Sequence, residues 1–419
     1  MSRLREFNAA TFRSFGTRNF RLFFGGQIVS QVGNWMTLVA QTLLVLHLTG
    51  SGVALGVLAA AQFGPILVLG PWAGLVADRS DKRRLLITVQ VIAMAQSFAL
   101  AALAFLADPP IVGIYLVALV GGLTVAFDNP ARRAFVTEMV PRDDIPNAVS
   151  LNSALMTGSR IIGPALAGLA VSTVGYGWAF VADGVSYVAV LLAYGLMRSG
   201  DLHRADPAPR GKGQVREGFR YARANRDLWV PLLMMAVVGT LSYNFQVVFP
   251  LFATRDLGGS GATFTVLFSV MSVGALVGAL AVARRTRISL RTVALTSIAF
   301  GIPMAVMVVV PNLTAALPVA FVVGLGSISF LTASTAIVQT HSSQEMRGRV
   351  LALQAMVFLG STPIGGPILG WISETFGARW GVAVGAAAAL GAGMWGLAVA
   401  RRPEVPLSPV GSRPDPQRA

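Results

Sequence analysis

Twelve long apolar segments constrain this chain more than any other feature of it. Each is close to the roughly 20 residues that a helix needs to cross the hydrocarbon core of a bilayer, and such segments must satisfy their backbone hydrogen bonds internally. Of 419 residues, 54% are hydrophobic and 12% are charged, whereas a soluble domain carries about 25% charged residues. The sequence therefore predicts an all-α integral membrane protein. We expect its helices at residues 20–47, 52–77, 84–107, 110–131, 148–174, 177–198, 229–254, 262–283, 291–310, 314–340, 349–374 and 379–400.

Basic residues gather on one side of these helices. With the amino terminus in the cytoplasm, nearly all of them lie before the first helix, in the loops after every second helix, or in the tail. The exceptions are Arg160, deep in a helix, and Arg255 and Arg379 on the opposite side. This distribution follows the positive-inside rule and predicts that both termini are cytoplasmic. Because the net charge of +15 follows topology, we expect no nucleic-acid binding.

Several residue types bear on location and chemistry. Arginine outnumbers lysine by 31 to 2, which is typical of a GC-rich bacterial genome, so we expect the bacterial inner membrane. Cysteine is absent, which excludes disulfides and thiol chemistry. The three histidines, His47, His203 and His341, have no spacing typical of a metal site. The chain carries no enzyme or nucleotide-binding motif, so we expect neither enzymatic activity nor a cofactor or metal.

The chain divides into two halves. Residues 199–228 interrupt the apolar rhythm with charged residues, Pro and Gly, and we interpret them as a cytoplasmic linker between six-helix bundles at residues 20–198 and 229–400. Residues 1–19 are basic with interspersed phenylalanines, which predicts an amphipathic segment on the inner membrane surface. Residues 401–419 form a cytoplasmic tail.

The two halves also echo each other in sequence. Leu48-Thr-Gly-Ser-Gly52 after the first helix matches Leu257-Gly-Gly-Ser-Gly261 after the seventh. Ile162-Gly-Pro164 matches Gly365-Gly-Pro367 in the same way. Such correspondence is expected of parallel structural repeats.

Polar side chains follow one face of the first helix. Gln27, Gln31, Asn34 and Gln41 are four, three and seven residues apart, which places their amides on a single face. Such a stripe either lines a watery cavity or forms interhelical hydrogen bonds with no ligand. Together with polar and aromatic residues of the fifth and seventh helices, it gives the substrate-binding residues that we expect: Gln27, Gln31, Asn34, Trp35, Arg160, Tyr243, Asn244 and Gln246.

Arg160 lies near the middle of the fifth predicted helix. Twelve residues after the helix start, it is about 18 Å from the cytoplasmic end at 1.5 Å per residue. A charge at this depth costs several kcal/mol unless it is paired or hydrated, and it is functional by default. We expect Arg160 to contact either substrate or a coupling carboxylate; the alternative is a purely structural ion pair.

Small residues in the same helix predict close packing. Ser159, Gly163 and Ala167 are four residues apart, which lets a neighbouring helix approach closely. We expect that neighbour to be the eighth helix. The residues assigned to this contact are Gly163, Pro164, Gly168, Gly274 and Gly278.

Two further acids are embedded in the apolar segments. A proton-driven exporter needs at least one carboxyl group that exchanges protons within the membrane, and Asp128 and Asp183 are equal candidates. The last six helices contain no acid at comparable depth, so we expect coupling in the first half. Structural capping of a helix end explains Asp183 equally well.

The stretch Gly74-Leu-Val-Ala-Asp78-Arg79-Ser-Asp-Lys-Arg83-Arg84 resembles the loop between helices 2 and 3 of the major facilitator superfamily. This resemblance implies twelve transmembrane helices in two pseudo-symmetric bundles that rock around a central substrate site. It extends over essentially the whole chain.

The same resemblance implies a latch. In that family the aspartate matching Asp78 sits against the start of helix 11, where the helix dipole favours an anion, and closes the cytoplasmic side in the outward-facing state. Neighbouring arginines pair with an acid at the inner end of helix 4, for which Asp128 is the best candidate. The implied latch residues are Gly74, Asp78, Arg79, Arg83, Arg84 and Asp128. The alternative is a loop that only sets topology.

Four motifs resemble the branch that holds enterobactin exporters and macrolide efflux pumps: Arg18 to Phe24, Pro71 to Arg79, Asp128 to Arg132, and Arg347-Gly-Arg349. Residues 159–168 are similar to the helix 5 motif of drug:proton antiporters. The resemblance implies that a monomer embedded in membrane lipids exports a small amphipathic organic molecule, a drug-like compound or siderophore, in exchange for protons. The alternatives are a lipid or lysophospholipid translocase of the same fold, and a non-transporting membrane scaffold or receptor.

Overall fold

The computed structural model describes residues 11–203, 214–283 and 288–401. Within these residues, twelve helical spans are long and apolar enough to cross a membrane, which confirms the predicted fold class. The predictions for residues 1–10, 204–213, 284–287 and 402–419 concern parts of the amino-terminal segment, the linker, one loop and the tail. They lie outside the described residues.

The first half contains six long helices whose bounds mostly agree with the prediction to within three residues. They are α2 (Arg18–Thr49), α3 (Gly52–Arg79), α4 (Lys82–Ala104), α5 (Ile111–Glu138), α6 (Ile145–Thr173) and α7 (Gly175–Leu196). The exception is α5, which runs seven residues beyond its predicted end at residue 131.

A short helix, α8 (Gln214–Ala224), precedes the second half. The α-helices that follow are α9 (Arg226–Ser242), α10 (Phe245–Leu251), α11 (Gly261–Ala283), α12 (Leu290–Val309), α13 (Leu313–His341), α14 (Gln344–Thr375) and α15 (Ala378–Ala400). The seventh membrane span consists of α9, α10 and a π-helical turn at Phe252–Asp256. We predicted a continuous helix at residues 229–254; instead, the helix is broken at Tyr243 and Asn244.

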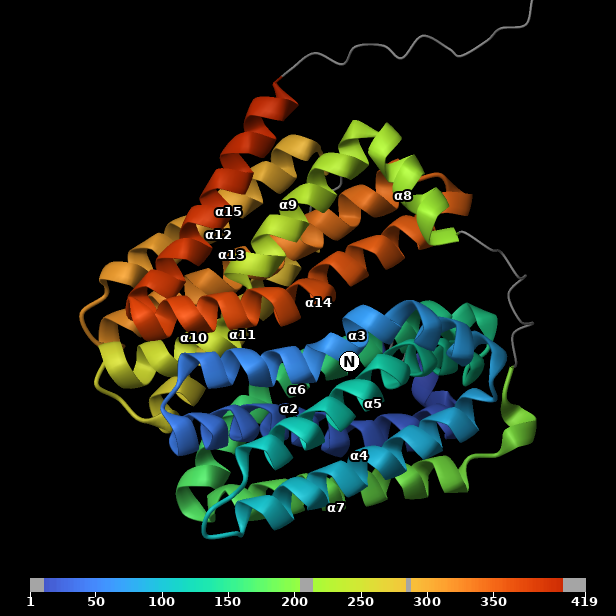
Figure 1. Cartoon of the computed structure of the whole chain (residues 1–419). Coiled ribbons are helices and arrows are strands. Elements are labelled where there is room, and N and C mark those ends of the chain that lie inside the picture. Colours follow the sequence, from blue (N-terminus) through green and yellow to red (C-terminus); the bar gives the residue numbers. More distant parts are fainter. Residues whose placement is uncertain (1–10, 204–213, 284–287, 402–419) are drawn as a thin grey trace, which may run out of the picture.

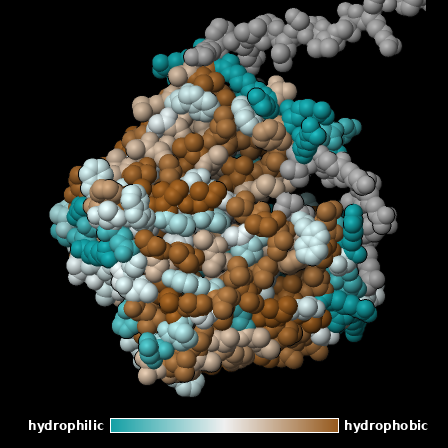
Figure 2. All heavy atoms as spheres, in the orientation of Figure 1, coloured by the Kyte–Doolittle hydropathy of each residue, from teal (hydrophilic) through white to brown (hydrophobic). Residues whose placement is uncertain are grey.

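Figure 1 shows the two halves as separate bundles, the first coloured blue to green and the second yellow to red, with α3 and α14 along the boundary between them. On the face that Figure 2 shows, hydrophobic residues cover much of the surface, and hydrophilic residues gather toward its left and right edges. A surface of this kind suits a protein embedded in lipid. We call the end that carries Asp78 the inner end, and the end that carries Gly52 the outer end.

The two halves touch at their outer ends through the backbones of α3 and α14. A Cβ atom added to Gly56 would lie 2.6 Å from Pro367 Cα, and one added to Gly52 would lie 2.5 Å from the carbonyl oxygen of Gly370. Only glycine allows backbones to approach this closely. The structure is therefore closed at its outer end.

The same helix faces separate at the inner end. Gly74 follows Gly56 by 18 residues, or five helical turns, so the two share one face of α3. Gly348 and Gly366 have the same relation on α14. A Cβ atom added to Gly74 or Gly348 would have no neighbouring atom within 4 Å. The halves consequently diverge toward the inner end.

Polar contacts also join the two halves at the outer end. The carboxylate of Glu374, at the end of α14, accepts hydrogen bonds from the Ser51 hydroxyl at 2.6 Å and from the Val53 amide at 2.9 Å. It thus caps the amino terminus of α3, where the helix dipole favours an anion. Arg255 of the second half donates to the carbonyl oxygen of Gly50 at 2.5 Å.

The packing of α6 differs in part from the prediction. Gly163 lies against α2, where a Cβ atom would come 3.0 Å from the Val32 carbonyl oxygen, while Gly168 lies against Thr265 of α11. Gly274 and Gly278 contact α13 instead of α6. The predicted contact between α6 and α11 exists through Gly168, but its assignment to Gly274 and Gly278 is wrong, because their faces of α11 are occupied by α13.

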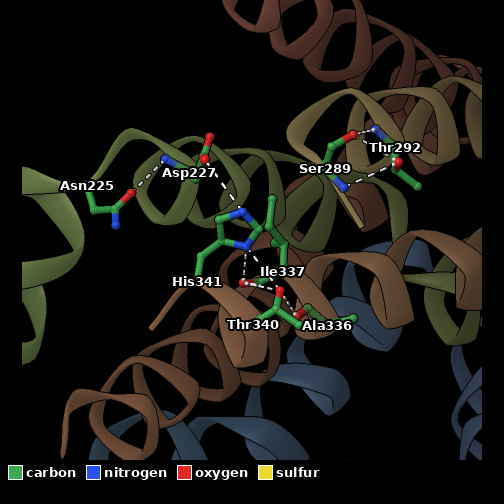
Figure 3. A network of polar contacts seen from close by, with 8 residues as sticks. All are labelled: Asn225, Asp227, Ser289, Thr292, Ala336, Ile337, Thr340 and His341. Carbon is green, nitrogen blue, oxygen red and sulfur yellow. Dashed lines mark hydrogen bonds and ion pairs between the residues drawn. The ribbon is translucent and has the colours of Figure 1, made fainter. Parts of the chain in front are cut away.

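A polar network joins α9 to α13 at the inner end of the second half (Figure 3). The side chain of Asn225 accepts a hydrogen bond from the Asp227 amide at 3.0 Å and so caps α9. His341, the last residue of α13, has Nε2 3.7 Å from the Asp227 carboxylate and Nδ1 3.2 Å from the Ile337 carbonyl oxygen. These contacts tie the start of α9 to the end of α13.

Candidate functional site

A cavity of about 320 Å³ lies between the two halves, within the range of small-molecule sites. Helices of both halves form its wall, including α2, α5 and α6 of the first half and the α9–α10 break, α11 and α14 of the second. Seven of the eight predicted binding residues lie on this wall: Gln31, Asn34, Trp35, Arg160, Tyr243, Asn244 and Gln246. Their binding of a substrate stays a prediction.

Amide side chains dominate the polar part of the wall. Gln62, Gln90 and Gln96 of α3 and α4 join the predicted amides of α2. Gln62 donates a hydrogen bond to Gln41 at 2.9 Å. These three were not predicted, because Gln62 is the single glutamine of α3, and Gln90 and Gln96 are six residues apart in α4, without the repeated spacing that reveals the stripe on α2.

The remaining predicted residue, Gln27, lies behind the wall and connects its polar groups. It donates to the Tyr194 hydroxyl at 3.1 Å, and its carbonyl oxygen accepts from Gln31 at 3.1 Å and from Arg132 at 3.3 Å. The stripe was expected either to line a cavity or to form hydrogen bonds between helices, and different residues of it do each. Gln27 makes interhelical hydrogen bonds, whereas Gln31 and Asn34 face the cavity.

Asp128 and Arg132 form an ion pair on the cavity wall. They lie one turn apart on α5, with Arg132 Nη2 2.8 Å from the Asp128 carboxylate. Gln90 donates to the same carboxylate at 2.9 Å, and Arg132 also donates to Asn129 at 3.1 Å. The opposite charges of Asp128 and Arg132 compensate each other, so the pair adds no net charge to the wall.

The predicted pairing of Asp128 with Arg79, Arg83 or Arg84 is wrong for this conformation, because Arg132 occupies that position. Arg132 was not predicted as a membrane-embedded cation, because the helix was expected to end at residue 131. In the structure the helix continues through Pro130 to Glu138. The sequence does indicate that the helix continues, because the apolar residues Phe135 and Val136 follow the proline. Both are buried in the structure.

The inner-end loop uses other partners. Glu138, at the end of α5, forms an ion pair with Lys82 at 2.7 Å. Arg83 donates to the Tyr194 carbonyl oxygen at 2.8 Å and to the Ser199 hydroxyl at 2.7 Å. Asp78 and Arg79 are exposed at the open inner end, so the proposed latch is not engaged in this conformation.

Arg160 faces the cavity from α6. Its guanidinium carbon lies 5.2 Å from the centre of the Trp35 ring. Among the described residues, no acidic side chain lies within ion-pair distance of it. The alternative of a structural ion pair therefore finds no support in this conformation.

Asp183 of α7 is buried among three helices, with 1% of its surface exposed. Its carboxylate accepts hydrogen bonds from Thr37 of α2 at 2.8 Å and Ser97 of α4 at 2.7 Å, with Ser186 at 3.5 Å. The capping interpretation is wrong, because Asp183 lies more than two turns inside α7 and its main donors belong to other helices. Thr37 also lines the cavity and so links Asp183 to it.

The second half contributes the broken seventh span. The Tyr243 hydroxyl donates to the Ser327 carbonyl oxygen of α13, and Asn244 donates to the Thr240 carbonyl oxygen at 2.7 Å. These bonds hold the two residues between α9 and α10, so that both face the cavity together with Gln246. Irregular backbone at membrane depth is tolerated where it lines a cavity.

A family model described as a transmembrane secretion effector matches residues 9–409 of this chain. The chain belongs to that family. This membership confirms the predicted resemblance to the major facilitator superfamily and makes the chain a multi-pass membrane transporter.

Curated relatives of this family member match over most of their length. The staphyloferrin A transporter of Staphylococcus aureus is 25% identical, with 85% of this chain and 90% of the relative covered. Macrolide efflux protein A of Streptococcus pyogenes is 23% identical, with 83% and 87% covered. The multidrug efflux pump Tap of Mycolicibacterium fortuitum is 26% identical, with 84% and 88% covered.

Solved structures share the fold. A bacterial homologue of the human lysosomal transporter Spinster, in an inward-facing and unoccupied conformation, superposes with a TM-score of 0.70 at 16% identity, covering 91% of this chain and 95% of that chain. A peptide transporter with bound sulfate gives 0.76 at 13% identity, covering 92% and 94%. At these identities the comparison supports the fold alone.

Proposed function

We propose that the protein exports a small amphipathic organic molecule, drug-like or siderophore-like, across the bacterial inner membrane in exchange for protons. This proposal rests mainly on the cavity between the halves, which is closed at the outer end and open at the inner end. A central site whose two sides open in turn is what alternating access requires. The efflux proteins among the relatives support the direction of transport.

The proposed topology follows from the charge distribution. Both termini and the linker would lie in the cytoplasm, so that the inner end defined above faces the cytoplasm. The two bundles at residues 20–198 and 229–400 would be the units that rock. One chain supplies the whole cavity wall, which supports a monomer as the transport unit.

Asp183 is our candidate for the proton-carrying group. No cation lies beside its carboxyl group in the described part of the chain, so it can gain or lose a proton without breaking an ion pair. Asp128 would have to release Arg132 to do the same. Thr37 provides a hydroxyl between Asp183 and the cavity, along which a proton can move.

The direct test measures proton flux in proteoliposomes across a panel of amphipathic compounds. With an imposed pH gradient, we expect compound-dependent proton movement and compound movement in the opposite direction. Asp183→Asn should retain compound binding but lose the acceleration by the gradient. Transport that is indifferent to the gradient in the wild-type protein would reject proton exchange, and full acceleration in Asp183→Asn would reject this residue as the carrier.

We also propose that Asp78 latches the inner end in the opposite conformation. It follows Gly56 by 22 residues, so at 100° per residue it lies within about 40° of the face of α3 that meets α14. When the inner ends approach, Asp78 would reach the amino terminus of α14 near Arg347 and Gly348. Glu374 makes the corresponding contact with α3 at the outer end.

A further inference from the structure

The charges that face the cavity do not cancel. Three charged residues line it: Asp128, Arg132 and Arg160. The first two neutralise each other at 2.8 Å. Asp183, the other acid embedded nearby, is bonded to hydroxyl groups and does not line the wall. The described cavity wall therefore presents one unbalanced positive charge, on Arg160.

The surroundings of Arg160 do not replace a counter-ion. Its guanidinium carbon lies 5.2 Å from the centre of the Trp35 ring, and a cation–π contact is weaker than an ion pair. A cation in a membrane-spanning segment is costly unless water or a partner compensates its charge. An anionic ligand entering this cavity would remove much of that cost. A cationic ligand would be repelled.

Nearby amide oxygens supply acceptors that complement this cation. The side-chain oxygens of Gln31 and Gln90 are buried, and neither is bonded within the described residues. Both residues line the cavity and are at most 4% exposed. They can accept hydrogen bonds from N–H or O–H groups of a ligand. Trp35, Tyr243 and Phe358 offer aromatic surface beside them.

We propose that the transported molecule is an amphipathic organic anion, whose carboxylate pairs with Arg160 and whose hydrogen-bond donors meet Gln31 and Gln90. The planar guanidinium matches a carboxylate through two parallel hydrogen bonds. A lipid phosphate offers related anion chemistry, so the experiment includes it as a separate source. This inference rests on the proposed export function, whose site it describes more closely.

The test uses naphthyl compounds that share one scaffold and end in a carboxylate, a carboxamide or an ammonium group, with a labelled lysophospholipid as a fourth probe. Binding to the full-length protein in detergent and transport in proteoliposomes are both measured. We expect the carboxylate to bind at least tenfold more tightly than the carboxamide, and the ammonium compound to bind most weakly. The carboxylate should also bind more tightly than the lysophospholipid.

Variants assign the preference to Arg160. Arg160→Gln should weaken carboxylate binding far more than carboxamide binding and so remove the preference for the carboxylate, and Arg160→Lys should retain part of this preference. Arg21→Gln is the matched control, because Arg21 is exposed at the start of α2 and does not line the cavity. Thermal unfolding of each ligand-free variant reveals any that fails to fold, in which case Arg160→Lys carries the comparison.

Each contrary result has a defined meaning. If neutral or cationic compounds bind as well as the carboxylate, or if no carboxylate binds, the inference is overturned, although transport of any compound would still support the export function. Selective binding of the lysophospholipid would overturn the carboxylate assignment and favour a lipid substrate. If Arg160→Gln weakens the binding of all compounds equally, Arg160 has only a structural role, and the inference is also overturned.

Discussion

At the scale of single residues, the ion pair between Asp128 and Arg132 allows a direct energetic test. Both side chains are largely buried, with 12% and 6% exposed. Removing one partner of a buried pair leaves an uncompensated charge and costs about 3–5 kcal/mol. We expect Asp128→Asn and Arg132→Gln each to lower the free energy of unfolding by about that amount, as measured by denaturation in detergent.

The double variant separates pairing from other effects. Asp128→Asn combined with Arg132→Gln removes both charges and should lose much less stability than the sum of the single variants. Arg21→Gln, a charge change at an exposed position, should have little effect. Additive losses in the double variant would mean that the two residues act independently, contrary to the geometry.

The residues that sequence reasoning found share one property: each is conspicuous against its apolar surroundings. Arg160 and the amide stripe of α2 are polar where lipid or core would require apolar groups, and Arg160 and all members of the stripe except Gln27 reach the cavity. Gln90 and Arg132 were missed for different reasons. Gln90 and Gln96 of α4 are six residues apart and give no helical periodicity, and Arg132 stands next to Arg133 after a proline, which is typical of a loop.

At the scale of helices, α3 carries Gly56 near its outer end and Gly74 near its inner end, both on the face that meets α14. Gly56→Val would place a side chain against the Pro367 and Gly366 backbones at 2.6–2.9 Å, and backbone cannot move aside cheaply. We expect it to open the outer end. Gly74→Val has free space in this conformation, so it should obstruct only the closing of the inner end.

Labelling distinguishes the two variants. A cysteine at Thr362, on the cavity wall, is reached by an impermeant maleimide only through an open end. From the cytoplasmic side its labelling should fall in Gly56→Val and be maintained or rise in Gly74→Val, whereas transport should fall in both. Identical labelling in the two variants would contradict the assignment of these glycines to opposite gates.

Glu374 offers a second test on the same helices. As an exposed anion at a helix amino terminus, it contributes at most about 1 kcal/mol. Glu374→Gln should therefore shift the balance between the two conformations by up to about fivefold away from the outer-closed one, measured by the same labelling. Asp108→Asn, an exposed acid elsewhere in the outer loops, is the control and should leave the balance unchanged.

The bounds of most helices followed from the apolar pattern, because lipid exposure demands nearly continuous hydrophobicity over a fixed length. The break at Tyr243 could not be predicted in this way. No glycine or proline marks it, and it is compensated by bonds from Tyr243 to Ser327 of α13 and from Asn244 to Thr240. Such compensation is tertiary, so a local pattern does not reveal it.

At the scale of the whole molecule, the two bundles were predictable because the charge pattern and the internal repeat are global features of the sequence. The conformation was not predictable. Glycines lie on the same helix faces at both ends, five turns apart on α3 and on α14, but only those at the outer end are in contact with the other half. The sequence carries glycines at both places and gives no indication of which end is in contact.

The absence of native cysteine makes the alternation of these contacts directly testable. Cysteines replacing Ser51 and Glu374 should be joined by a short bifunctional thiol reagent in this conformation, because the native side chains lie 2.6 Å apart. Cysteines replacing Gly74 and Gly348 should be joined only when the inner end closes. Either crosslink should stop transport, and a cleavable reagent should restore it, because a transporter locked at one end cannot complete its cycle. Substrate or a pH gradient should raise the yield of one crosslink and lower the yield of the other, because the outer and inner ends are not expected to close at the same time. Molecules that carry both crosslinks at once and still transport would show that the halves do not rock, and that the cavity is loaded by some other motion.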